Sequence, residues 1–207
     1  LSHGSIHVRW NRDHSYYDQA GWRGTWKEDG GALMNQCIHG IDLLIWLMGS
    51  PVQSVYGTVR NFNHSYIEAE DFGMAILQFE NGSVATIEGT TDTYINAEEA
   101  CLCVYGLNGA VKLGGATYNN IEKWTFSDKR GEDEKIILNK YVSSVYGNSH
   151  PLVFKNMIDA LQSKNKISIN AMHGMRALET VLAIYKSAKE RKVVTMPIGD
   201  FSTMDMM

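Results

Sequence analysis

Residues 30–49 read GGALMNQCIHGIDLLIWLMG, and they predict the central helix of the fold. Glycines stand at both ends of the stretch, as expected where a helix begins and stops. On a helical wheel, at about 100° per residue, the apolar side chains share one broad face: Leu33, Met34, Cys37, Ile38, Ile41, Leu44, Ile45 and Met48. Asn35, His39 and Asp42 fall on the opposite side. Because residues three and four apart are neighbours on a helix, these three form a polar row.

The polar row has two interpretations. It is either a solvated face with one ordinary histidine, or a catalytic His39 with Asn35 beside it and Asp42 behind it. Two neighbouring features favour the catalytic interpretation. The pair Gly30-Gly31 permits a close approach of backbone or substrate. The segment before the pair is rich in aromatic and polar side chains, namely Tyr16, Tyr17, Trp22, Arg23 and Trp26.

Length and composition are those of an ordinary globular domain. The 207 residues suffice for a substantial core, and the net charge of −4 gives no electrostatic case for a nucleic-acid partner. No run of about 18 apolar residues occurs, so we expect no membrane partner. Three cysteines without metal-type spacing indicate a reducing, cytoplasmic location, with Cys101 and Cys103 as a core thiol pair. Since the first residue is Leu1, we expect further residues upstream.

Strand patterns dominate the middle of the chain. Alternating apolar residues predict strands at 5–10, 52–62, 71–79, 83–91, 100–105, 110–113, 119–126 and 135–138. Asn81-Gly82 between two such runs is a strong signal for an antiparallel hairpin. Later residues predict helices at 151–163 and 172–191, a short strand at 193–196 and a frayed tail at 200–207. We interpret residues 11–27 as an ordered loop, and loops of this length inside a compact domain often contribute to function.

This order of elements indicates an α+β fold. We expect an open-faced, predominantly antiparallel sheet with helices gathered on one face. Aromatic and β-branched residues occur at both parities of several strands, so the second face should be covered by another domain or by self-association. No internal repeat or linker divides the sequence, and residues 1–207 are therefore a single domain.

Several common functional motifs are absent from the sequence. It contains no Gly-x-Gly-x-x-Gly dinucleotide fingerprint, no Walker-type glycine loop, no Gly-x-Ser-x-Gly elbow and no His-Glu-x-x-His zinc helix. His3 and His7 are four residues apart on an extended segment, a spacing that does not favour binding of one metal ion by both. His64, His150 and His173 are isolated in the sequence. We therefore expect no cofactor-binding or metal-ligating residues in this chain.

Four segments around the central helix carry a resemblance to a known family. They are Trp22-Arg23-Gly24-Thr25-Trp26, Asp29-Gly30-Gly31-Ala32-Leu33-Met34-Asn35-Gln36, Ile38-His39 and Asp42-Leu43-Leu44. These segments resemble the second domain of the glucose–fructose oxidoreductase/inositol dehydrogenase (Gfo/Idh/MocA) family. Segments at 70–82, 105–109 and 183–197 extend the match to roughly residues 4–198.

The resemblance implies a two-domain, NAD(P)-dependent enzyme. In the family an amino-terminal Rossmann domain binds NAD or NADP and carries a catalytic lysine. The second domain, similar to the C-terminal domain of dihydrodipicolinate reductase, is an open-faced sheet that contacts substrate and forms oligomers. This chain is then that second domain alone, without a Rossmann domain, and by itself it should be inactive and bind no cofactor.

The resemblance also assigns roles to individual residues. It implies that His39 assists proton transfer at the substrate hydroxyl, a task for which an imidazole suits near neutral pH. Asn35 stands where many members have Asp, and because an amide cannot act as a base it should orient substrate. Branches that oxidise nucleotide-linked sugars are similar in this Asn and in an upstream pair, here Arg12 and Tyr17. We expect Arg23 to contact substrate as well, because a guanidinium group readily forms two parallel hydrogen bonds to a phosphate or a carboxylate.

Two functions of different classes follow. The first is the substrate-binding part of a dehydrogenase that acts on a secondary alcohol of a sugar, cyclitol or nucleotide-linked sugar. The alternative is a non-catalytic module for sheet-mediated dimerisation or ligand binding, motivated by the expected covering of the second sheet face.

Overall fold

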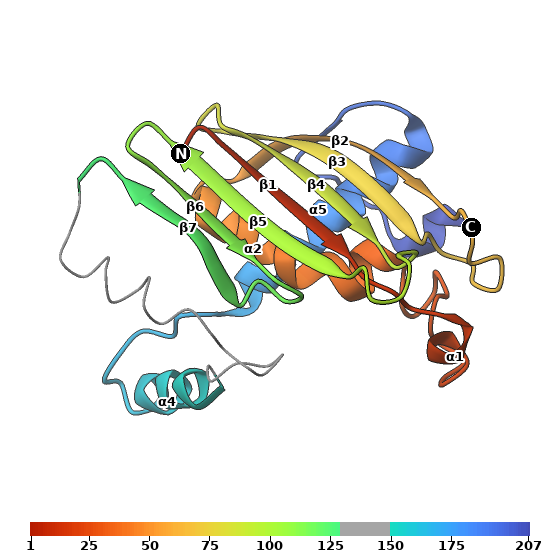
Figure 1. Ribbon diagram of the computed structural model, residues 1–207, viewed down its shortest axis with the longest axis horizontal. Coiled ribbons are helices and arrows are strands. Elements are labelled where there is room, and N and C mark those ends of the chain that lie inside the picture. The colour runs from red at the N-terminus through yellow and green to blue at the C-terminus, as the bar shows by residue number, and fades with distance from the viewer. Residues whose placement is uncertain (129–149) are drawn as a thin grey trace.

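A computed structural model describes residues 1–128 and 150–207 of the chain (Figure 1). The helices are α1 (His14–Tyr17), a π-helical segment (Leu33–Cys37), α2 (Ile38–Met48), α4 (His150–Leu161), α5 (Ala171–Glu190) and a 3-10 helix (Thr203–Met206). The strands are β1 (His3–Arg9), β2 (Val52–Arg60), β3 (Phe72–Phe79), β4 (Val84–Thr90), β5 (Glu99–Gly106), β6 (Gly109–Gly114), β7 (Asn120–Phe126) and β8 (Val194–Thr195). The predicted strand at 135–138 lies outside the described residues.

The strands form one open sheet in the order β7-β6-β5-β1-β4-β3-β2-β8. The hairpin expected at Asn81-Gly82 joins β3 to β4, and the expected antiparallel character is confirmed for every pair but one. The exception is β1, which lies between β4 and β5 and pairs with β4 in parallel, with Ile6 opposite Ile87. Hairpin signals report only neighbours in sequence, so this long-range pairing escaped the sequence analysis.

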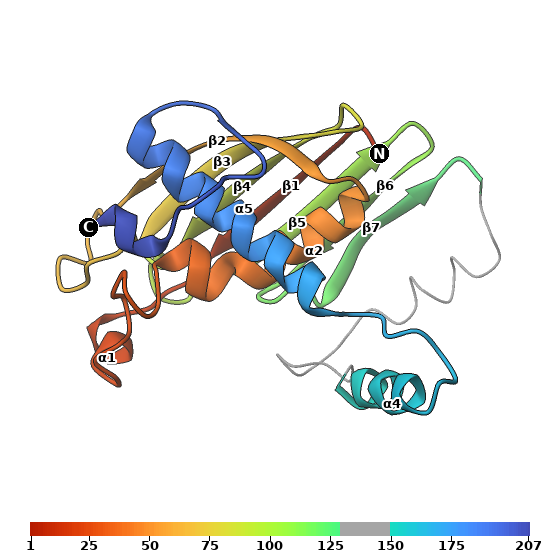
Figure 2. The ribbon, with the colours of Figure 1, turned by 180° about the vertical axis from the view of Figure 1, so that it is seen from behind.

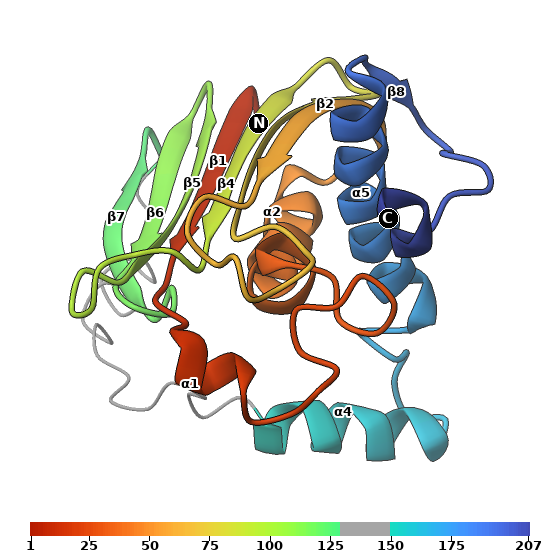
Figure 3. The same cartoon turned by 90° about the vertical axis from the view of Figure 1, so that its right-hand side faces the viewer.

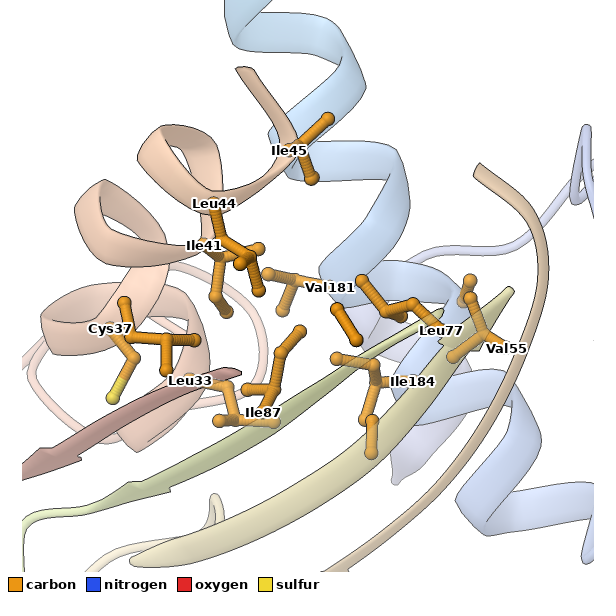
Figure 4. Close-up of a cluster of buried hydrophobic side chains, with 14 of the residues drawn as sticks. Leu33, Cys37, Ile41, Leu44, Ile45, Val55, Leu77, Ile87, Val181 and Ile184 are labelled. Atoms are coloured by element: carbon orange, nitrogen blue, oxygen red, sulfur yellow. The ribbon is translucent and has the colours of Figure 1, made fainter. Parts of the chain in front are cut away.

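Helices α2 and α5 cover one face of the sheet. Figures 2 and 3 show α2 lying over the centre of the sheet and α5 over the β2 side. The core forms between these layers, where Leu33, Ile41 and Leu44 meet Ile87 and Ile184 (Figure 4). All five are essentially inaccessible to solvent. The predicted apolar face of the central helix is thus the face that anchors it to the sheet.

The predicted central helix is present but begins irregularly. Its first turn, Leu33–Cys37, is π-helical, and regular α-helix starts at Ile38. The expected closing glycine is confirmed, since Gly49 adopts a left-handed conformation with φ of 68° that L side chains rarely adopt. A π turn holds one more residue than an α turn, so a uniform 100° wheel misplaces the start of the helix.

One expectation about the carboxyl-terminal part is confirmed and one is wrong. The helix expected at 151–163 is α4, none of whose residues is buried; it lies apart from the sheet (Figure 3), and Leu152 and Phe154 are exposed. The tail at 200–207 is not frayed, because it forms a 3-10 helix and packs Phe201 and Met206 against the core. No helix within the described ranges is long and apolar enough to cross a bilayer.

Candidate functional site

The entry of the central helix is held by a buried carboxyl group. Glu70 Oε1 accepts hydrogen bonds from the Leu33 N–H and the Tyr185 hydroxyl, both at 2.9 Å, and the Glu70 carbonyl accepts the Ala32 N–H. The Tyr185 oxygen accepts the Gly31 N–H at 3.3 Å. Three successive backbone donors at the start of the helix are therefore satisfied, which fixes where the helix begins.

Gly31 is required at this entry because Glu70 lies directly against it. A Cβ atom at position 31 would overlap both the carboxylate and the carbonyl oxygen of Glu70. The close approach expected from the glycine pair is thus made by a side chain of this domain. The pKa of Glu70 is raised to about 8, and burial is the largest cause of this shift. The hydrogen bonds to Glu70 act in the opposite direction and lower its pKa.

A small hollow opens beside this entry. It is a shallow surface depression rather than an enclosed cavity, and its lining is formed by Tyr16, Tyr17, Asp29, Gly30, Gly31, Ala32, Asn35 and Gln36. Five of the lining residues have polar side chains, namely Tyr16, Tyr17, Asp29, Asn35 and Gln36, and they lie beside the backbone of the helix entry.

Asn35 is the centre of a hydrogen-bond network in the hollow. Its amide nitrogen donates to Asp29 Oδ1, and its Oδ1 accepts from the Tyr16 hydroxyl at 3.3 Å and from Gln36 Nε2. Asp29 in turn accepts the Gly24 N–H at 2.7 Å through its other oxygen. These contacts fix which way the Asn35 amide points, as a substrate-orienting residue requires.

His39 follows Asn35 on the same helix but stands apart from this network. Its side chain is exposed to solvent. Among the described residues no hydrogen bond joins His39 to Asn35 or Asp42. The predicted polar row is therefore a set of separate side chains.

The other predicted site residues gather around Tyr16. Arg12 donates to Gln36 Oε1 at 2.7 and 3.1 Å, and Arg23 lies over the Tyr16 ring, with Cζ 4.1 Å from the centroid. Tyr17 lines the hollow, its hydroxyl lies 3.1 Å from Thr91 Oγ1, and burial raises its pKa to about 12. The structure thus brings Arg12, Tyr17, Arg23 and Asn35 together.

One further cluster was not expected. His64, Asp71 and Asp92 each offer a ligand atom within 4.8 Å of the others, the single group of this kind in the described ranges. Asp71 Oδ2, however, already accepts the N–H groups of Phe62, Asn63 and His64 at 2.9 to 3.1 Å. Its lone pairs hold the loop after β2, so the cluster organises backbone and does not suit a cation.

Sequence reasoning missed Tyr16, Gln36, Asp29 and Glu70 as site residues. Asp29 and Gln36 stood inside the quoted motif, and Tyr16 was noted only for its aromatic character. Glu70 is distant in sequence from the helix that it caps, and no local pattern announces such a contact. The one available signal was that a glutamate stands directly before the strand predicted at 71–79, since a buried glutamate is rarely left without a partner.

Comparison with known proteins identifies the chain's relatives. The family model described as "Oxidoreductase family, C-terminal alpha/beta domain" matches residues 3–196. The WlbA dehydrogenase from Bordetella pertussis, in complex with NADH and UDP-GlcNAcA, superposes with a TM-score of 0.87 at 38% identity over 95% of this chain. WlbA from Chromobacterium violaceum, with the same two ligands, gives 0.85 and 35% over 96%.

A curated relative is more distant. The uncharacterized oxidoreductase YrbE of Bacillus subtilis (strain 168) is 28% identical over 99 residues, which is 46% of this chain and 29% of that protein. This chain covers 56% and 55% of the two WlbA chains, so it spans little more than half their length. With the family model matched along almost all of the sequence, the chain belongs to the Gfo/Idh/MocA oxidoreductase family, as its C-terminal alpha/beta domain.

Proposed function

We propose that this chain is the substrate-binding part of a longer, NAD(P)-dependent dehydrogenase that oxidises a secondary alcohol of a nucleotide-linked sugar. The observation that supports this most is the hollow in which Asn35 is held by Tyr16 and Asp29, with Arg12 beside it. The similarity to WlbA, which binds NADH and UDP-GlcNAcA, favours a nucleotide-linked sugar over a free sugar or cyclitol.

The proposed chemistry divides between two domains. This sequence has no dinucleotide fingerprint, so its residues do not suit the cofactor, which a Rossmann domain would hold. A nicotinamide held there would supply the acceptor for the hydride that leaves the carbinol carbon. In this chain, Asn35 orients the substrate hydroxyl and His39 takes up its proton and passes it to solvent. The cytoplasmic location that we propose agrees with the three free, buried thiols.

Self-association through the sheet is a second proposed property. The face opposite α2 and α5 exposes Tyr56, Met74, Ile76 and Val84 on neighbouring strands. Contiguous apolar side chains on an open sheet are typical of an interface. We propose that this face forms a homo-oligomer, and the same surface is the basis of the alternative function, a non-catalytic dimerisation module.

The role of His39 is tested in the full-length enzyme. His39→Ala should lower kcat by about 10²–10⁴-fold, because general acid–base assistance is lost. His3→Ala is the matched control, since His3 lies on β1 outside the hollow, and it should leave kcat unchanged. Turnover is followed through the absorbance of the reduced nicotinamide. Wild-type kcat in His39→Ala would remove this residue from the mechanism.

A further inference from the structure

Two thiols lie side by side on the open face of the sheet. Cys101 and Cys103 are two residues apart on β5, so their side chains point to the same face. Leu102 and Val104, which alternate with them, belong to the core between sheet and helices, and the two cysteines therefore point to the opposite face. Their sulfur atoms are 3.6 Å apart. The expected thiol pair is thus present and buried, but it lies outside the core that the helices cover.

The separation of the two sulfur atoms fits one class of ligand. At a metal–sulfur bond length of about 2.3 Å, a tetrahedral ion such as Zn²⁺ places two thiolates about 3.8 Å apart, whereas a linear ion at that bond length needs about 4.6 Å. The observed separation of 3.6 Å is close to the tetrahedral value. The two sulfur atoms can therefore hold a tetrahedral ion with little movement of β5.

A disulfide fits these positions less well. Residues two apart on a strand have Cα atoms about 6.6 Å apart, close to the upper limit of about 6.8 Å that disulfides span. The sulfur atoms would also have to approach from 3.6 Å to a bond length of about 2.05 Å. Chelation of a cation needs the smaller change, so the geometry favours chelation over oxidation.

His7 on the neighbouring strand is the candidate for a third ligand. In the pairing of β1 with β5 it stands directly opposite Cys101, so the two side chains share a face and lie within reach of each other. Its Nε2 is buried and makes no hydrogen bond in the described part of the chain. Imidazole nitrogen and thiolate sulfur are the preferred ligands of zinc. Because Nε2 lies 3.3 Å from Glu99 Oε1, the imidazole has to turn toward the sulfur atoms to complete the site.

The charges around the thiol pair do not oppose a cation. Lys112 on the adjacent strand β6 is paired through Nζ with Glu122 Oε2 at 2.5 Å. Arg9, the next residue after His7 on this face of β1, is paired with both Glu88 and Glu99. Both neighbouring positive charges are thus balanced by carboxylates. When a divalent ion binds, each thiol releases its proton to solvent, and the two thiolates balance the charge of the ion.

We propose that Cys101, Cys103 and His7 bind a thiophilic divalent cation of the zinc class, with water in the fourth tetrahedral position. Such an ion joins β5 to β1, which come from distant parts of the chain, and stabilises the centre of the sheet. Spacing along the chain did not indicate this site, because its third member lies on another strand. None of the three residues lines the hollow, so the proposal is independent of the proposed function.

The first test uses Co²⁺ as a spectroscopic substitute for Zn²⁺ in the full-length protein, which is treated with a chelator and kept in a thiol-free reducing agent. Added Co²⁺ should produce a sulfur-to-cobalt charge-transfer band and the intense visible bands of tetrahedral coordination. Added Zn²⁺ should then abolish both. A wild-type protein that shows no charge-transfer band, or only the weak visible bands of octahedral cobalt, would overturn the proposal.

Variants of the thiols assign the site to this pair. Cys101→Ser and Cys103→Ser should each weaken Zn²⁺ binding by about a hundredfold or more, because a thiolate ligand is lost, as measured by competition with a chromophoric chelator. Cys37→Ala is the matched control, since it removes the third thiol, which lies in the core, and it should bind Zn²⁺ like wild type. Circular dichroism verifies that each variant is folded. Unchanged affinity in folded Cys101→Ser and Cys103→Ser would refute the assignment.

The role of His7 is tested against a histidine on the same strand. His7→Ala should weaken Zn²⁺ binding by about tenfold or more and retain the charge-transfer band, because both thiolates remain. His3→Ala is the control, since His3 lies on the same face of β1 opposite Tyr105, and it should bind Zn²⁺ like wild type. If His7→Ala binds Zn²⁺ as tightly as His3→Ala, His7 is not a ligand and the three-residue site is wrong.

Discussion

Single residues at the helix entry determine whether the hollow exists. Gly30 has a φ of 72°, and Gly31 has no side chain in the space that Glu70 occupies. Because this space is open, Glu70 can reach the first N–H groups of the helix. The sequence marked this place as a close approach. It did not reveal that the approaching group is Glu70, because the two residues lie on different elements and meet only in the folded chain.

Gly31→Ala tests this packing directly. The added methyl group overlaps the Glu70 backbone oxygen, which no side-chain rotation can relieve, so we expect a loss of about 2 kcal/mol or more in the free energy of unfolding. Gly21→Ala is the control, because no atom lies within 4 Å of its added Cβ, and the loss there should stay below about 0.5 kcal/mol. Urea denaturation measures both; equal stabilities would refute the packing argument.

The central helix is the element on which the site depends. Its buried face, with Leu33, Ile41 and Leu44, was predictable because a period near 3.6 residues marks one face of a helix. The π-helical first turn was not, because the regular period does not report it, and the groups that bond its entry, Glu70 and Tyr185, lie far away in the sequence. This turn carries Asn35 and Gln36, so the part of the helix that forms the hollow is the part that the regular pattern describes least well.

Titration of Glu70 should link the stability of this helix entry to pH. Its pKa is about 8 in the folded chain and close to 4.5 when unfolded, so between these values the folded state binds more protons. The contribution is therefore complete below about pH 4.5 and is lost as pH rises through about 8. Relative to Glu70→Gln, wild-type stability should fall by up to about 1.4 kcal/mol per pH unit over this interval.

The measurement is urea unfolding of both proteins at several pH values, with the difference in unfolding free energy plotted against pH. Gln is the matched replacement, because its amide oxygen retains the hydrogen bonds from Leu33 and Tyr185. A difference that stays constant from about pH 5 to about pH 8 would show that Glu70 does not titrate in this interval.

At the scale of the molecule, the fold class and the family were predictable, whereas the sheet order was only partly so. Alternation and Asn81-Gly82 give β3 and β4 as a hairpin, because such pairing is local. The insertion of β1 between β4 and β5 joins residues far apart in the chain, which alternation alone does not specify. The stacking of Arg12 and Arg23 on the Tyr16 ring has the same character, since it depends on how a loop without regular period folds back on itself.

The uncovered sheet face gives the prediction at this scale. Ile76→Lys places a charge in the middle of the apolar strands, so self-association should weaken. Leu107→Lys is the control, because Leu107 is exposed in the turn between β5 and β6 and away from that face. Sedimentation velocity measures both variants. A wild-type protein that stays monomeric at high concentration would contradict the proposed interface.

The central claim is that the hollow beside α2 receives a nucleotide-linked sugar. It is tested most directly by kcat/KM of the full-length enzyme for one sugar with and without its UDP group, measured through reduced nicotinamide. The account predicts at least about a hundredfold preference for the UDP-linked form, since the contacts expected from Arg12 and Arg23 are lost with the free sugar. Equal kcat/KM for both forms would contradict it.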